Sequence, residues 1–402
     1  MELPVFNHPP SDRIIVVGAG IVGSCLASFL SKSLGSRIIL IDRDIRGLPG
    51  STGHAPGFVG QYNEIPSLTE LAKRSVSYYT SQGEMGFQNV GGLEIGDGLA
   101  KRAEAAHSAG LESRLLNRQQ VLDLASIFVR EEYLAKEGNA GLFFPADGTA
   151  NAKIVTHTEQ DKAKANGAIF INADVTSYDQ GVNGWSIKTP LGLIEAQKVV
   201  FCTGIWASQL LPRLEHSVVT VSHPYSYSTP HEARPTQSPF IRWPQKHVYA
   251  RDHGLEDGLG SYAHAPIKVP KENHGDTAYG SWEDSFNDVL SDGYALLPQN
   301  IAEKFDEGRK FNGLFSVTPD GLPLVGEVKA GSYCAVGVWV THAAGSARLL
   351  ADMILGVSKE QDAYLRKDLD PRRFEGVEGV EDKAILEKRS LAKYNDIYNN
   401  EA

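Results

Sequence analysis

Three observations predict an α/β protein that combines a nucleotide-type βαβ unit with a separate, strand-rich part. The chain has 402 residues, of which 42% are apolar and 22% charged, which is enough for a large packed core. A glycine-rich turn near the N-terminus lies between two β-branched runs. A polar, aromatic and histidine-rich segment from about residue 218 to 280 has strand character and little sign of helix.

The glycines of the first unit each have a distinct role. A β-branched strand, a helix and a second strand follow one another over residues 14–42. At the first turn, Gly18 permits a tight bend, Gly20 lets the backbone approach a pyrophosphate, and Gly23 lets the helix pack on the sheet. A glycine pattern in this strand–turn–helix context predicts a Rossmann-type dinucleotide site.

The other contacts of a dinucleotide can be placed on the same unit. Ile21 and Val22 open the helix, whose first N–H groups and positive dipole end favour phosphate. Asp42 ends the second strand about 20 residues after Gly23, where a carboxylate accepts hydrogen bonds from ribose hydroxyls. This fingerprint alone does not separate NAD from FAD.

Two further features favour FAD. A long loop rich in Gly, Ser and Pro, residues 46–63, directly follows the second strand. Near the other end of the chain, a strand at 333–338, a loop at 339–345 and a helix at 346–355 repeat the opening order. The N-terminus of that second helix can face the flavin ring, where it stabilises the negative charge of the reduced flavin.

The remaining segments alternate between helix and strand. The predicted helices are 68–80, 100–108, 118–124 and 152–166, and the predicted strands are 89–95, 168–171, 174–178, 185–187 and 198–202. The tail from residue 358 mixes charges and is expected to form a peripheral helical meander.

Charge and composition exclude several classes of function. The net charge of −10 argues against nucleic acid as a partner, since phosphate binding needs clustered cations. Cys25, Cys202 and Cys334 form no CxxC pair, and the histidines show no metal-ligand spacing, so no metal site is expected. With no signal peptide and no apolar run long enough to span a membrane, we expect a soluble, cytoplasmic protein without a membrane partner.

At this point the sequence resembles a known family. Ser51-Thr-Gly-His-Ala-Pro-Gly57 is similar to a segment of dimethylglycine oxidase and its dehydrogenase relatives, in the D-amino-acid oxidase/sarcosine oxidase superfamily. Further matching segments are 90–94, 202–206, 260–264, 311–320 and 339–342, so the resemblance covers about residues 12–357. Dimethylglycine oxidase continues into a folate-binding half that this sequence does not contain, so the match is to the flavin module alone.

The resemblance implies a two-lobed flavoprotein with a Rossmann-type FAD domain and a mixed β-sheet substrate domain. The FAD domain is expected at 1–88, 140–217 and 312–402, and the substrate domain at 89–139 and 218–311. FAD is expected to be joined covalently to His54, and His223 and Tyr249 are expected to be catalytic, while His264 stays undecided. The cofactor-binding residues are expected to be Gly18, Gly20, Ile21, Val22, Gly23, Asp42, Arg43, Ser51, Thr52, His54, Phe58, Val175, Tyr249, Val340, Thr341, His342, Ala343 and Ser346.

The implied reaction is the oxidation of a secondary or tertiary amine, such as an N-methyl amino acid. A hydride would pass to flavin N5 and leave an iminium that water hydrolyses, which is an N-demethylation when the oxidised carbon is a methyl group. The flavin would be reoxidised by O₂ or by an electron carrier. An NAD-dependent Rossmann dehydrogenase and a non-catalytic flavin-binding partner protein are the alternatives. The sequence leaves the particular amine and the oligomeric state open.

Overall fold

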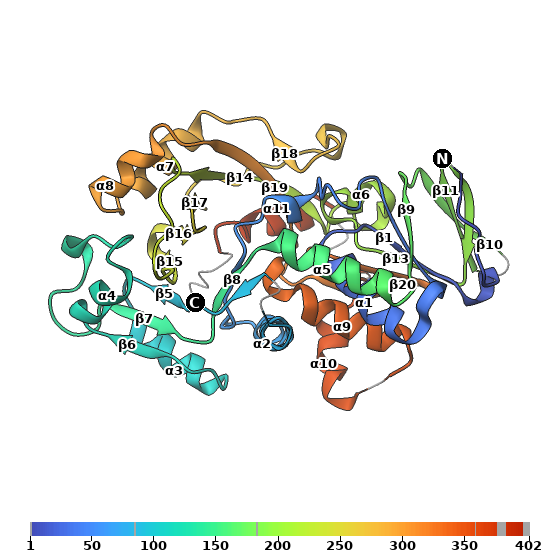
Figure 1. Ribbon diagram of the computed structural model, residues 1–402, viewed down its shortest axis with the longest axis horizontal. Helices are drawn as coiled ribbons and strands as arrows, with labels where there is room; N and C mark the ends of the chain where they lie inside the picture. Colours follow the sequence, from blue (N-terminus) through green and yellow to red (C-terminus); the bar gives the residue numbers. More distant parts are fainter. Residues whose placement is uncertain (1, 84–85, 182–183, 358, 376–382, 397–402) are drawn as a thin grey trace.

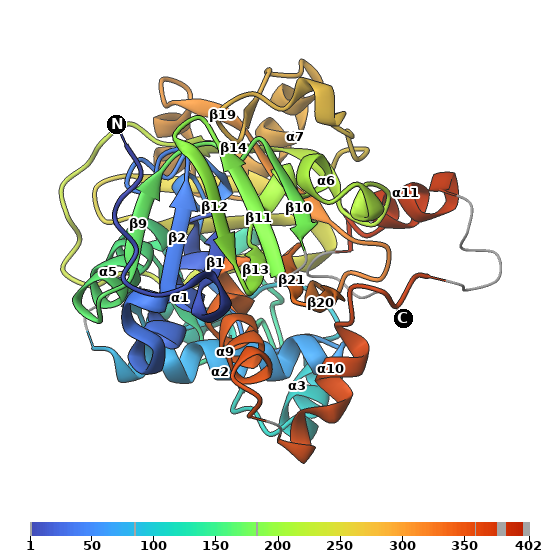
Figure 2. The same ribbon diagram turned by 90° about the vertical axis from the view of Figure 1, so that its right-hand side faces the viewer.

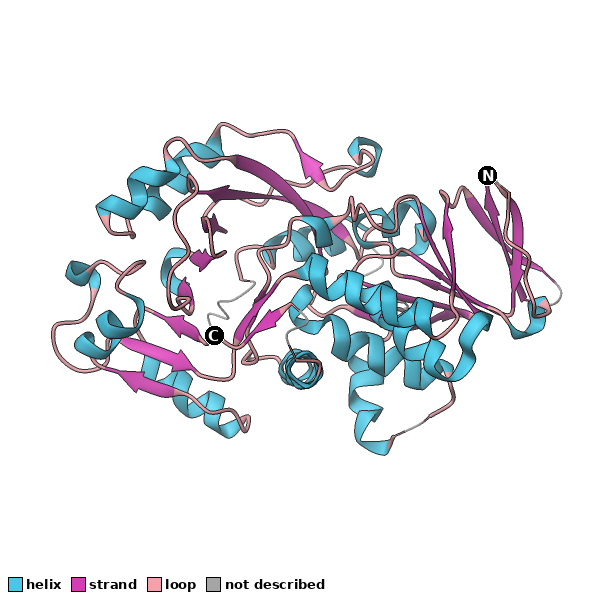
Figure 3. Cartoon of the chain, viewed as in Figure 1, coloured by secondary structure: helices cyan, strands magenta, loops and turns pink. Residues whose placement is uncertain are grey.

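The computed structural model describes residues 2–83, 86–181, 184–357, 359–375 and 383–396 (Figure 1). Within these ranges, two large sheets and two three-stranded sheets are combined with helices that lie in both halves of the molecule (Figure 3). The predicted α/β class, with a mixed sheet in addition to the nucleotide-type sheet, is confirmed.

The first large sheet is built around the N-terminal strand. Its order is β20 (Leu324–Lys329), β21 (Ser332–Val336), β13 (Lys198–Phe201), β1 (Ile14–Val17), β2 (Ile38–Asp42) and β9 (Ile169–Asn172). All neighbours are parallel except β20, which runs antiparallel to β21 at the edge. Because the central strands are buried on both faces, they are apolar at nearly every position.

Each face of this sheet has its own apolar core. Val16 and Leu40 face helices α1 (Ile21–Leu34), α5 (Ala152–Ala165) and α9 (Ala343–Ile354). Ile15 and Ile41 face the opposite way and pack with Trp185 of an antiparallel meander. The meander consists of β10 (Ser177–Gly181), β11 (Gly184–Thr189) and β12 (Gly192–Ala196), and Figure 2 shows it lying across the sheet.

The second large sheet has nine strands. Their order is β18 (Tyr279–Gly280), β19 (Lys310–Val317), β14 (Val219–Tyr227), β17 (Asp257–Ser261), β16 (Val248–Asp252), β15 (Phe240–Trp243), β5 (Gly92–Glu94), β7 (Gly141–Phe144) and β6 (Arg114–Leu116). Helices α3 (Leu99–Ser108), α4 (Arg118–Ala125), α7 (Ser285–Tyr294) and α8 (Gln299–Ala302) belong to this part of the chain. The histidine-rich segment thus forms strands, as its composition predicts.

Two of these strands come from segments that the predicted boundaries place in the FAD domain. Residues 141–144 form β7, and residues 312–317 form most of β19. Strand β19 pairs with β14 from Val219↔Val317 to Ser226↔Lys310. The division into two domains at the expected boundaries stays a prediction.

Short elements connect the two large sheets. Strands β3 (Phe58–Val59), β8 (Gly148–Ala150) and β4 (Phe87–Gln88) form a small antiparallel sheet, and helix α2 (Pro66–Ser81) packs against α9. The remaining helices are α6 (Ala207–Leu210), α10 (Ala363–Asp368) and α11 (Lys383–Ala392).

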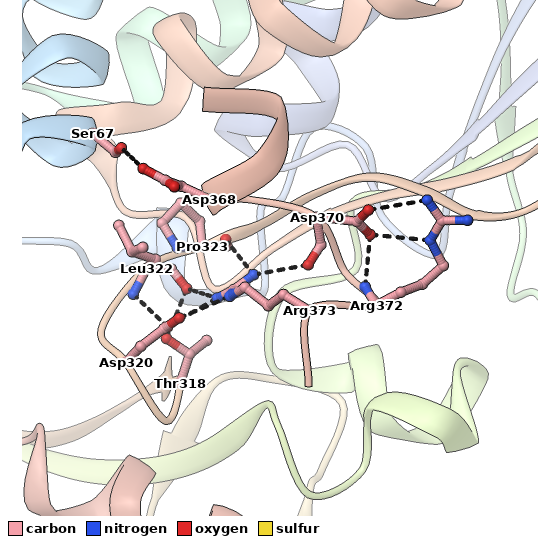
Figure 4. A network of polar contacts seen from close by, with 9 residues as sticks. All are labelled: Ser67, Thr318, Asp320, Leu322, Pro323, Asp368, Asp370, Arg372 and Arg373. Carbon is pink, nitrogen blue, oxygen red and sulfur yellow. Dashed lines mark hydrogen bonds and ion pairs between the residues drawn. The ribbon is translucent and has the colours of Figure 1, made fainter. Parts of the chain in front are cut away.

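The segment after α10 is fixed to the loop between β19 and β20 by a polar network (Figure 4). Arg373 donates through Nε and one terminal nitrogen to the two carboxylate oxygens of Asp320, at 2.8 and 2.9 Å, and also to the carbonyl of Leu322. Asp368, at the end of α10, accepts a 2.6 Å hydrogen bond from the hydroxyl of Ser67 on α2. These bonds hold the segment from Asp368 to Arg373 against α2 and the loop between β19 and β20.

The described residues contain no group of three or more His, Cys, Asp and Glu side chains arranged to hold a metal ion. Over the same ranges, none of the helices has both the length and the apolar character needed to cross a membrane. Cys25, Cys202 and Cys334 are all buried free thiols.

Candidate active site

A continuous pocket runs between the two large sheets. One end is lined by residues of β1, β2 and the turn into α1, and the other by residues of β14, β15, β16 and β19. Of the residues expected from the sequence, the pocket is lined by Gly18, Gly20, Ile21, Val22, Asp42, Arg43, Ser51, Thr52, His54, Phe58, Val175, His223, Tyr249, Val340 and Thr341. Gly23, His342, Ala343 and Ser346 are not among its lining residues.

The glycine turn leaves no room for side chains. Gly18 has φ of +101°, and a Cβ there would collide with the carbonyl of Cys202 at the end of β13. A Cβ at Gly23 would collide with the carbonyl of Gly18, so Gly23 serves helix packing behind the pocket. The turn therefore brings bare backbone to the pocket wall at the N-terminus of α1, which is the geometry that a pyrophosphate requires.

Asp42 and Arg43 lie at the end of β2. The carboxylate of Asp42 accepts hydrogen bonds from the N–H groups of Ala19, at 2.7 Å, and Asp44, at 3.0 Å, which orient it beside the glycine turn. Arg43 pairs with Asp174 at 3.1 Å, and its guanidinium lies 4.7 Å from the ring centre of Trp206. Asp42 thus offers a carboxylate, and Arg43 with Trp206 offers a flat surface, at this end of the pocket.

The loop after β2 returns to the glycine turn and to the second sheet. Its 3₁₀ turn, Ser51–Gly53, places the hydroxyl of Thr52 where it accepts a 3.1 Å hydrogen bond from the N–H of Ile21. The hydroxyl of Ser51 donates to the carbonyl of Leu314 in β19 at 2.7 Å. Two adjacent side chains of the turn are thus fixed, one to the N-terminus of α1 and the other to β19, and His54 follows directly after the turn.

His54 is held in a pocket of aromatic rings. Its ring centre lies 4.7 Å from that of Tyr279 and 5.6 Å from that of Phe311, and it occupies the space left by the missing side chain of Gly313. Burial, together with the positive charge of Lys153, lowers the pKa of His54 to about 4. Its Nδ1 is buried and has no hydrogen-bond partner among the residues that the structure describes. A neutral imidazole with an unused nitrogen is what a covalent link to a ring system needs.

His223 and Tyr249 meet in the opposite half of the pocket. The Nε2 of His223, in β14, lies 2.7 Å from the hydroxyl oxygen of Tyr249 in β16. The imidazole of His223 stacks on Tyr262 at 4.3 Å, and the backbone N–H of His223 donates to Asn312. Burial, followed by the nearby His264 and His54, lowers the pKa of His223 well below its ordinary value. The sequence-predicted pair is therefore brought together with a neutral imidazole.

The second helix end closes the pocket near its centre. Val340 and Thr341 line it, and they are fixed by hydrogen bonds from Tyr79 to the Val340 carbonyl (3.0 Å) and from Thr341 to the Phe58 carbonyl (2.8 Å). The next residue, His342, is buried behind this wall, and burial lowers its pKa to about 4. Ser346 lies within α9, and its hydroxyl oxygen is buried without a hydrogen-bond partner.

Sequence reasoning missed most of the walls around His223. These residues are aromatic, and they come from strands of the second sheet and from neighbouring loops: Tyr225, Phe240, Tyr262, Phe311, Phe315 and Trp339. We call this half of the pocket the aromatic chamber. The density of aromatic residues in the histidine-rich segment was a signal for these walls, although aromatic residues in strands more often belong to a hydrophobic core. No sequence pattern indicated that Tyr394, in the polar tail, belongs to this part of the molecule.

Charge is divided unevenly along the pocket. Among the described lining residues, the Asp and Arg side chains are Asp42, Arg43, Asp44 and Asp174, all near the end of β2 or β9, and none of the lining residues is Glu or Lys. The aromatic chamber carries its polarity on histidine and tyrosine. This arrangement suits a dinucleotide at one end and a small, weakly polar reactant at the other.

The residues present fit FAD on observations of this structure. The glycine turn would supply the close backbone approach, Asp42 would face the ribose, and the buried Nδ1 of His54 would lie toward the cofactor. The N-terminus of α9 follows directly after the lining residues Val340 and Thr341, so its dipole would favour the negative charge of a reduced flavin.

Comparisons with known proteins agree with this geometry. Residues 13–353 match the family model described as FAD dependent oxidoreductase (DAO). Mitochondrial dimethylglycine dehydrogenase of Mus musculus is 25% identical over 408 aligned residues, covering 93% of this chain and 46% of that protein. The 4-methylaminobutanoate oxidase (formaldehyde-forming) of Paenarthrobacter nicotinovorans is 24% identical over 394 residues, covering 92% of this chain and 46% of that protein.

A solved structure shows the same fold. The crystal structure of L-proline dehydrogenase from P. horikoshii superposes with a TM-score of 0.77 at 21% identity, covering 92% of this chain and 99% of that one. The chain spans less than half the length of the two curated relatives named above. Since the family model matches most of the sequence, the chain belongs to the FAD dependent oxidoreductase family.

Proposed function

We propose that the chain is an FAD-dependent enzyme that oxidises a secondary or tertiary amine, such as dimethylglycine, sarcosine or a related N-methyl amine. One observation carries the proposal: His223 and Tyr249, hydrogen bonded at 2.7 Å, lie in an aromatic chamber whose pocket continues into a dinucleotide cradle. The names of the relatives, a dimethylglycine dehydrogenase and a formaldehyde-forming 4-methylaminobutanoate oxidase, support an N-methyl substrate.

FAD, when bound, supplies the acceptor for a hydride leaving the carbon next to the amine nitrogen. The task of the protein is to present the amine without its proton, because an ammonium nitrogen has no lone pair with which to expel a hydride. Burial lowers the pKa of His223, so its imidazole is neutral, and together with Tyr249 it can hydrogen bond to the amine without placing a positive charge beside it. The proton of the ammonium form is left to solvent, because the exclusion of water from the chamber also lowers the pKa of the amine. Water then hydrolyses the iminium product, and O₂ or an electron carrier takes the electrons.

The aromatic chamber also suits the substrate before it loses its proton. Ring faces such as those of Tyr225, Tyr249 and Tyr262 attract an alkylammonium group without offering it a fixed negative charge. An aromatic wall holds the amine in place and still allows its pKa to fall when water is excluded. Both effects favour a compact N-alkyl amine.

Attachment of FAD through His54 is the second part of the proposal. The loop that carries His54 is tied to the glycine turn by Thr52 and to β19 by Ser51, so the imidazole has a fixed position between the cradle and the chamber. The pKa of about 4 keeps its ring nitrogens available as nucleophiles. A covalent bond to the flavin ring would also engage a nitrogen that otherwise stays buried and unpaired.

The reaction is tested by anaerobic mixing of the purified yellow protein with a panel of amines. Dimethylglycine, sarcosine, 4-methylaminobutanoate, proline and an N-methyl amine without a carboxylate would each be followed by bleaching of the flavin absorption. We expect at least one N-methyl amine to bleach the flavin and to yield formaldehyde in equal amount to the demethylated amine. Bleaching by proline alone would overturn the N-methyl proposal, and no bleaching by any amine of the panel would overturn amine oxidation.

The covalent link is tested by acid precipitation. We expect the flavin to stay with the precipitated polypeptide of the unmodified protein, with its added mass on the peptide that contains His54. In His54→Ala the flavin should appear in the supernatant, and the rate of flavin reduction should fall because the ring loses an electron-withdrawing substituent. His107→Ala, at an exposed position on α3, is the control and should keep the link. Free flavin released from the unmodified protein would contradict the proposal.

A further inference from the structure

Four side chains form one line of hydrogen bonds that starts in the aromatic chamber and ends on the backbone. Tyr249 Oη lies 2.7 Å from His223 Nε2, and His223 Nδ1 lies 2.8 Å from Tyr394 Oη. Tyr394 Oη is in turn 2.6 Å from His264 Nε2, and His264 Nδ1 is 2.8 Å from the carbonyl oxygen of Ala265. Each distance lies within the range of a formed hydrogen bond.

The line is buried, and its third member comes from the far C-terminal segment. Tyr394 is 0% exposed, His223 6% and His264 7%. Tyr394 and His264 do not line the pocket, whereas His223 and Tyr249 do. The hydrogen bonds of Tyr394 and His264 therefore reach the pocket through His223.

Helix α11 and the residue after Tyr394 hold this tyrosine in place. Glu387 on α11 accepts from Lys268 at 2.6 Å and pairs with His216 at 3.1 Å, which attaches the helix beside β14. Asn395 donates to the carbonyls of Tyr262, at 2.5 Å, and His264, at 2.8 Å. The Tyr394 ring packs against Phe315 at 6.0 Å, nearly parallel to it.

The backbone carbonyl at the end of the line sets the direction of every bond in it. A carbonyl oxygen only accepts, so Nδ1 of His264 carries a proton and donates to Ala265. Burial lowers the pKa of His264, and a neutral imidazole then has a bare Nε2 that must accept the proton of Tyr394. Tyr394 donates its single hydroxyl proton to His264, so its oxygen accepts the hydrogen bond from Nδ1 of His223.

The same reasoning reaches the chamber. If Nδ1 of His223 donates to Tyr394, then Nε2 of the neutral His223 is bare and accepts the proton of Tyr249. Tyr249 is left with an oxygen that can only accept from any further donor, such as an N–H group of a bound amine. Through four hydrogen bonds, the carbonyl of Ala265 thus decides that Tyr249 presents an acceptor to the chamber.

We propose that Tyr394 and His264 are positioning residues that hold His223 in the tautomer with its proton on Nδ1, so that its Nε2 accepts the hydrogen bond from the hydroxyl of Tyr249. The consequence for turnover rests on the proposed amine oxidation, whereas the tautomer itself does not. Without Tyr394, Nδ1 of His223 has no acceptor, the proton can move to Nε2, and the Tyr249–His223 bond then reverses.

The tautomer is measured directly by nitrogen NMR of the purified protein labelled with nitrogen-15 histidine. Protonated and bare ring nitrogens have different shifts, and the signals of His223 among the 12 histidines are assigned by their loss in His223→Gln. We expect a bare Nε2 and a protonated Nδ1 on His223 in the unmodified protein. In Tyr394→Phe, which keeps the packed ring, we expect a mixture of tautomers.

Kinetics provide the second measurement. Tyr394→Phe should lower the rate of flavin reduction at saturating amine by about ten- to hundredfold, the range found when partners that orient ligating histidines are removed. The half-saturating amine concentration should change little, because Tyr394 does not line the pocket. Tyr78→Phe, which removes a hydroxyl bonded to Glu159 outside the pocket, is the matched control and should keep the parent rate.

Variants at His264 separate a positioning role from a general packing role. In His264→Gln, a side-chain carbonyl can accept the proton of Tyr394, so the His223 tautomer and most of the rate should be retained. In His264→Leu no acceptor remains for the proton of Tyr394, so the His223 tautomer and the reduction rate should change as they do in Tyr394→Phe. Thermal unfolding curves for all variants establish that the fold is kept.

The outcomes are distinct. A His223 with its proton on Nε2 in the unmodified protein, or a tautomer unaffected by Tyr394→Phe, overturns the inference. The inference is also overturned if His264→Gln changes the tautomer and the rate as much as His264→Leu does. If no amine reduces the flavin while the tautomer still depends on Tyr394, the proposed function fails and the positioning role stands.

Discussion

The imidazole of His223 is bonded through both of its nitrogens, and the hydroxyl of Tyr249 reaches the pocket wall directly. The pair can therefore hydrogen bond to a bound amine and orient it in its uncharged form. We predict that His223→Ala and Tyr249→Phe each lower the rate of flavin reduction by roughly ten- to ten-thousandfold, the span typical of positioned acid–base groups. Anaerobic stopped-flow mixing at saturating amine measures these reduction rates.

The histidine control for this experiment is His107→Ala, which changes an exposed residue of α3 outside the pocket and should keep the parent rate. The flavin absorption of each variant must match that of the parent, so that a lost cofactor is not read as lost chemistry. Unchanged reduction rates in both His223→Ala and Tyr249→Phe would remove the pair from the active site.

Gly313 shows how a missing side chain supports the proposed flavin link. It faces His223 across the β14–β19 pairing, and a Cβ there would come within 2.8 Å of Cδ2 and Nε2 of His54. We predict that Gly313→Ala displaces the His54 ring and lowers the fraction of flavin that stays bound after acid precipitation. Gly275→Ala, where an added Cβ meets nothing within 4 Å, is the matched control and should leave that fraction unchanged. Full covalent attachment in Gly313→Ala would show that the ring tolerates the shift.

At the scale of elements, α11 connects a surface ion pair to a buried tyrosine. Glu387 accepts from Lys268 and pairs with His216, and these bonds keep its pKa below the ordinary value although burial acts in the opposite direction. A carboxyl with a lowered pKa stabilises the folded state above its unfolded pKa and loses that effect as the pH falls through the folded value. Docking of α11 should therefore weaken in acid.

We predict that Glu387→Gln loosens α11 and costs about 1 kcal/mol or less, as expected for a partly exposed ion pair. Amide hydrogen exchange should rise in α11 and around Tyr262–Ala265, and flavin reduction should slow in the same direction as in Tyr394→Phe but by less. Glu112→Gln, in an exposed pair with Arg114, is the control. Exchange and rate both equal to the parent would show that α11 is held by apolar packing alone.

The elements also show what the sequence could and could not predict. The β1–α1–β2 unit was predictable because the roles of Gly18 and Asp42 depend on neighbours within about 30 residues. The pairing of β14 with β19 joins strands whose residues are some ninety positions apart, and no local pattern encodes it. Tyr394 was missed for the same reason: a polar tail gives no sign that one of its rings is fully buried against a strand 171 positions earlier in the chain.

At the scale of the molecule, the pocket lies where the two large sheets meet, and the small sheet β3–β8–β4 links them. Asp147 lies in the turn between β7 and β8, so it stands at this junction. It is 3% exposed, and one carboxylate oxygen accepts a 2.9 Å hydrogen bond from the N–H of Gln61, just beyond β3. Its backbone carbonyl accepts from the N–H of Gly91, just before β5, at 2.9 Å.

Burial raises the pKa of Asp147 to about 7, although the hydrogen bond from Gln61 acts to lower it. An unfolded aspartate has a pKa of about 4, so between about pH 4 and 7 the folded state keeps a proton that the unfolded state has lost. Stability therefore falls as the pH rises through this range, and above about pH 7 the full cost of a buried charge is present. The junction of the two sheets is weakest under mildly alkaline conditions.

Asp147→Asn tests this, because an amide oxygen still accepts from Gln61 and carries no charge at any pH. We predict that the variant is more stable than the parent by about 1–3 kcal/mol at pH 8, and that the difference shrinks toward zero near pH 4. Urea unfolding at several pH values measures both quantities. Asp123→Asn, at an exposed position on α4, is the control and should follow the parent curve in parallel. If Asp147→Asn keeps the pH slope of the parent, the carboxyl is already ionised in the folded state at acidic pH, and a charged group at the sheet junction is tolerated without cost.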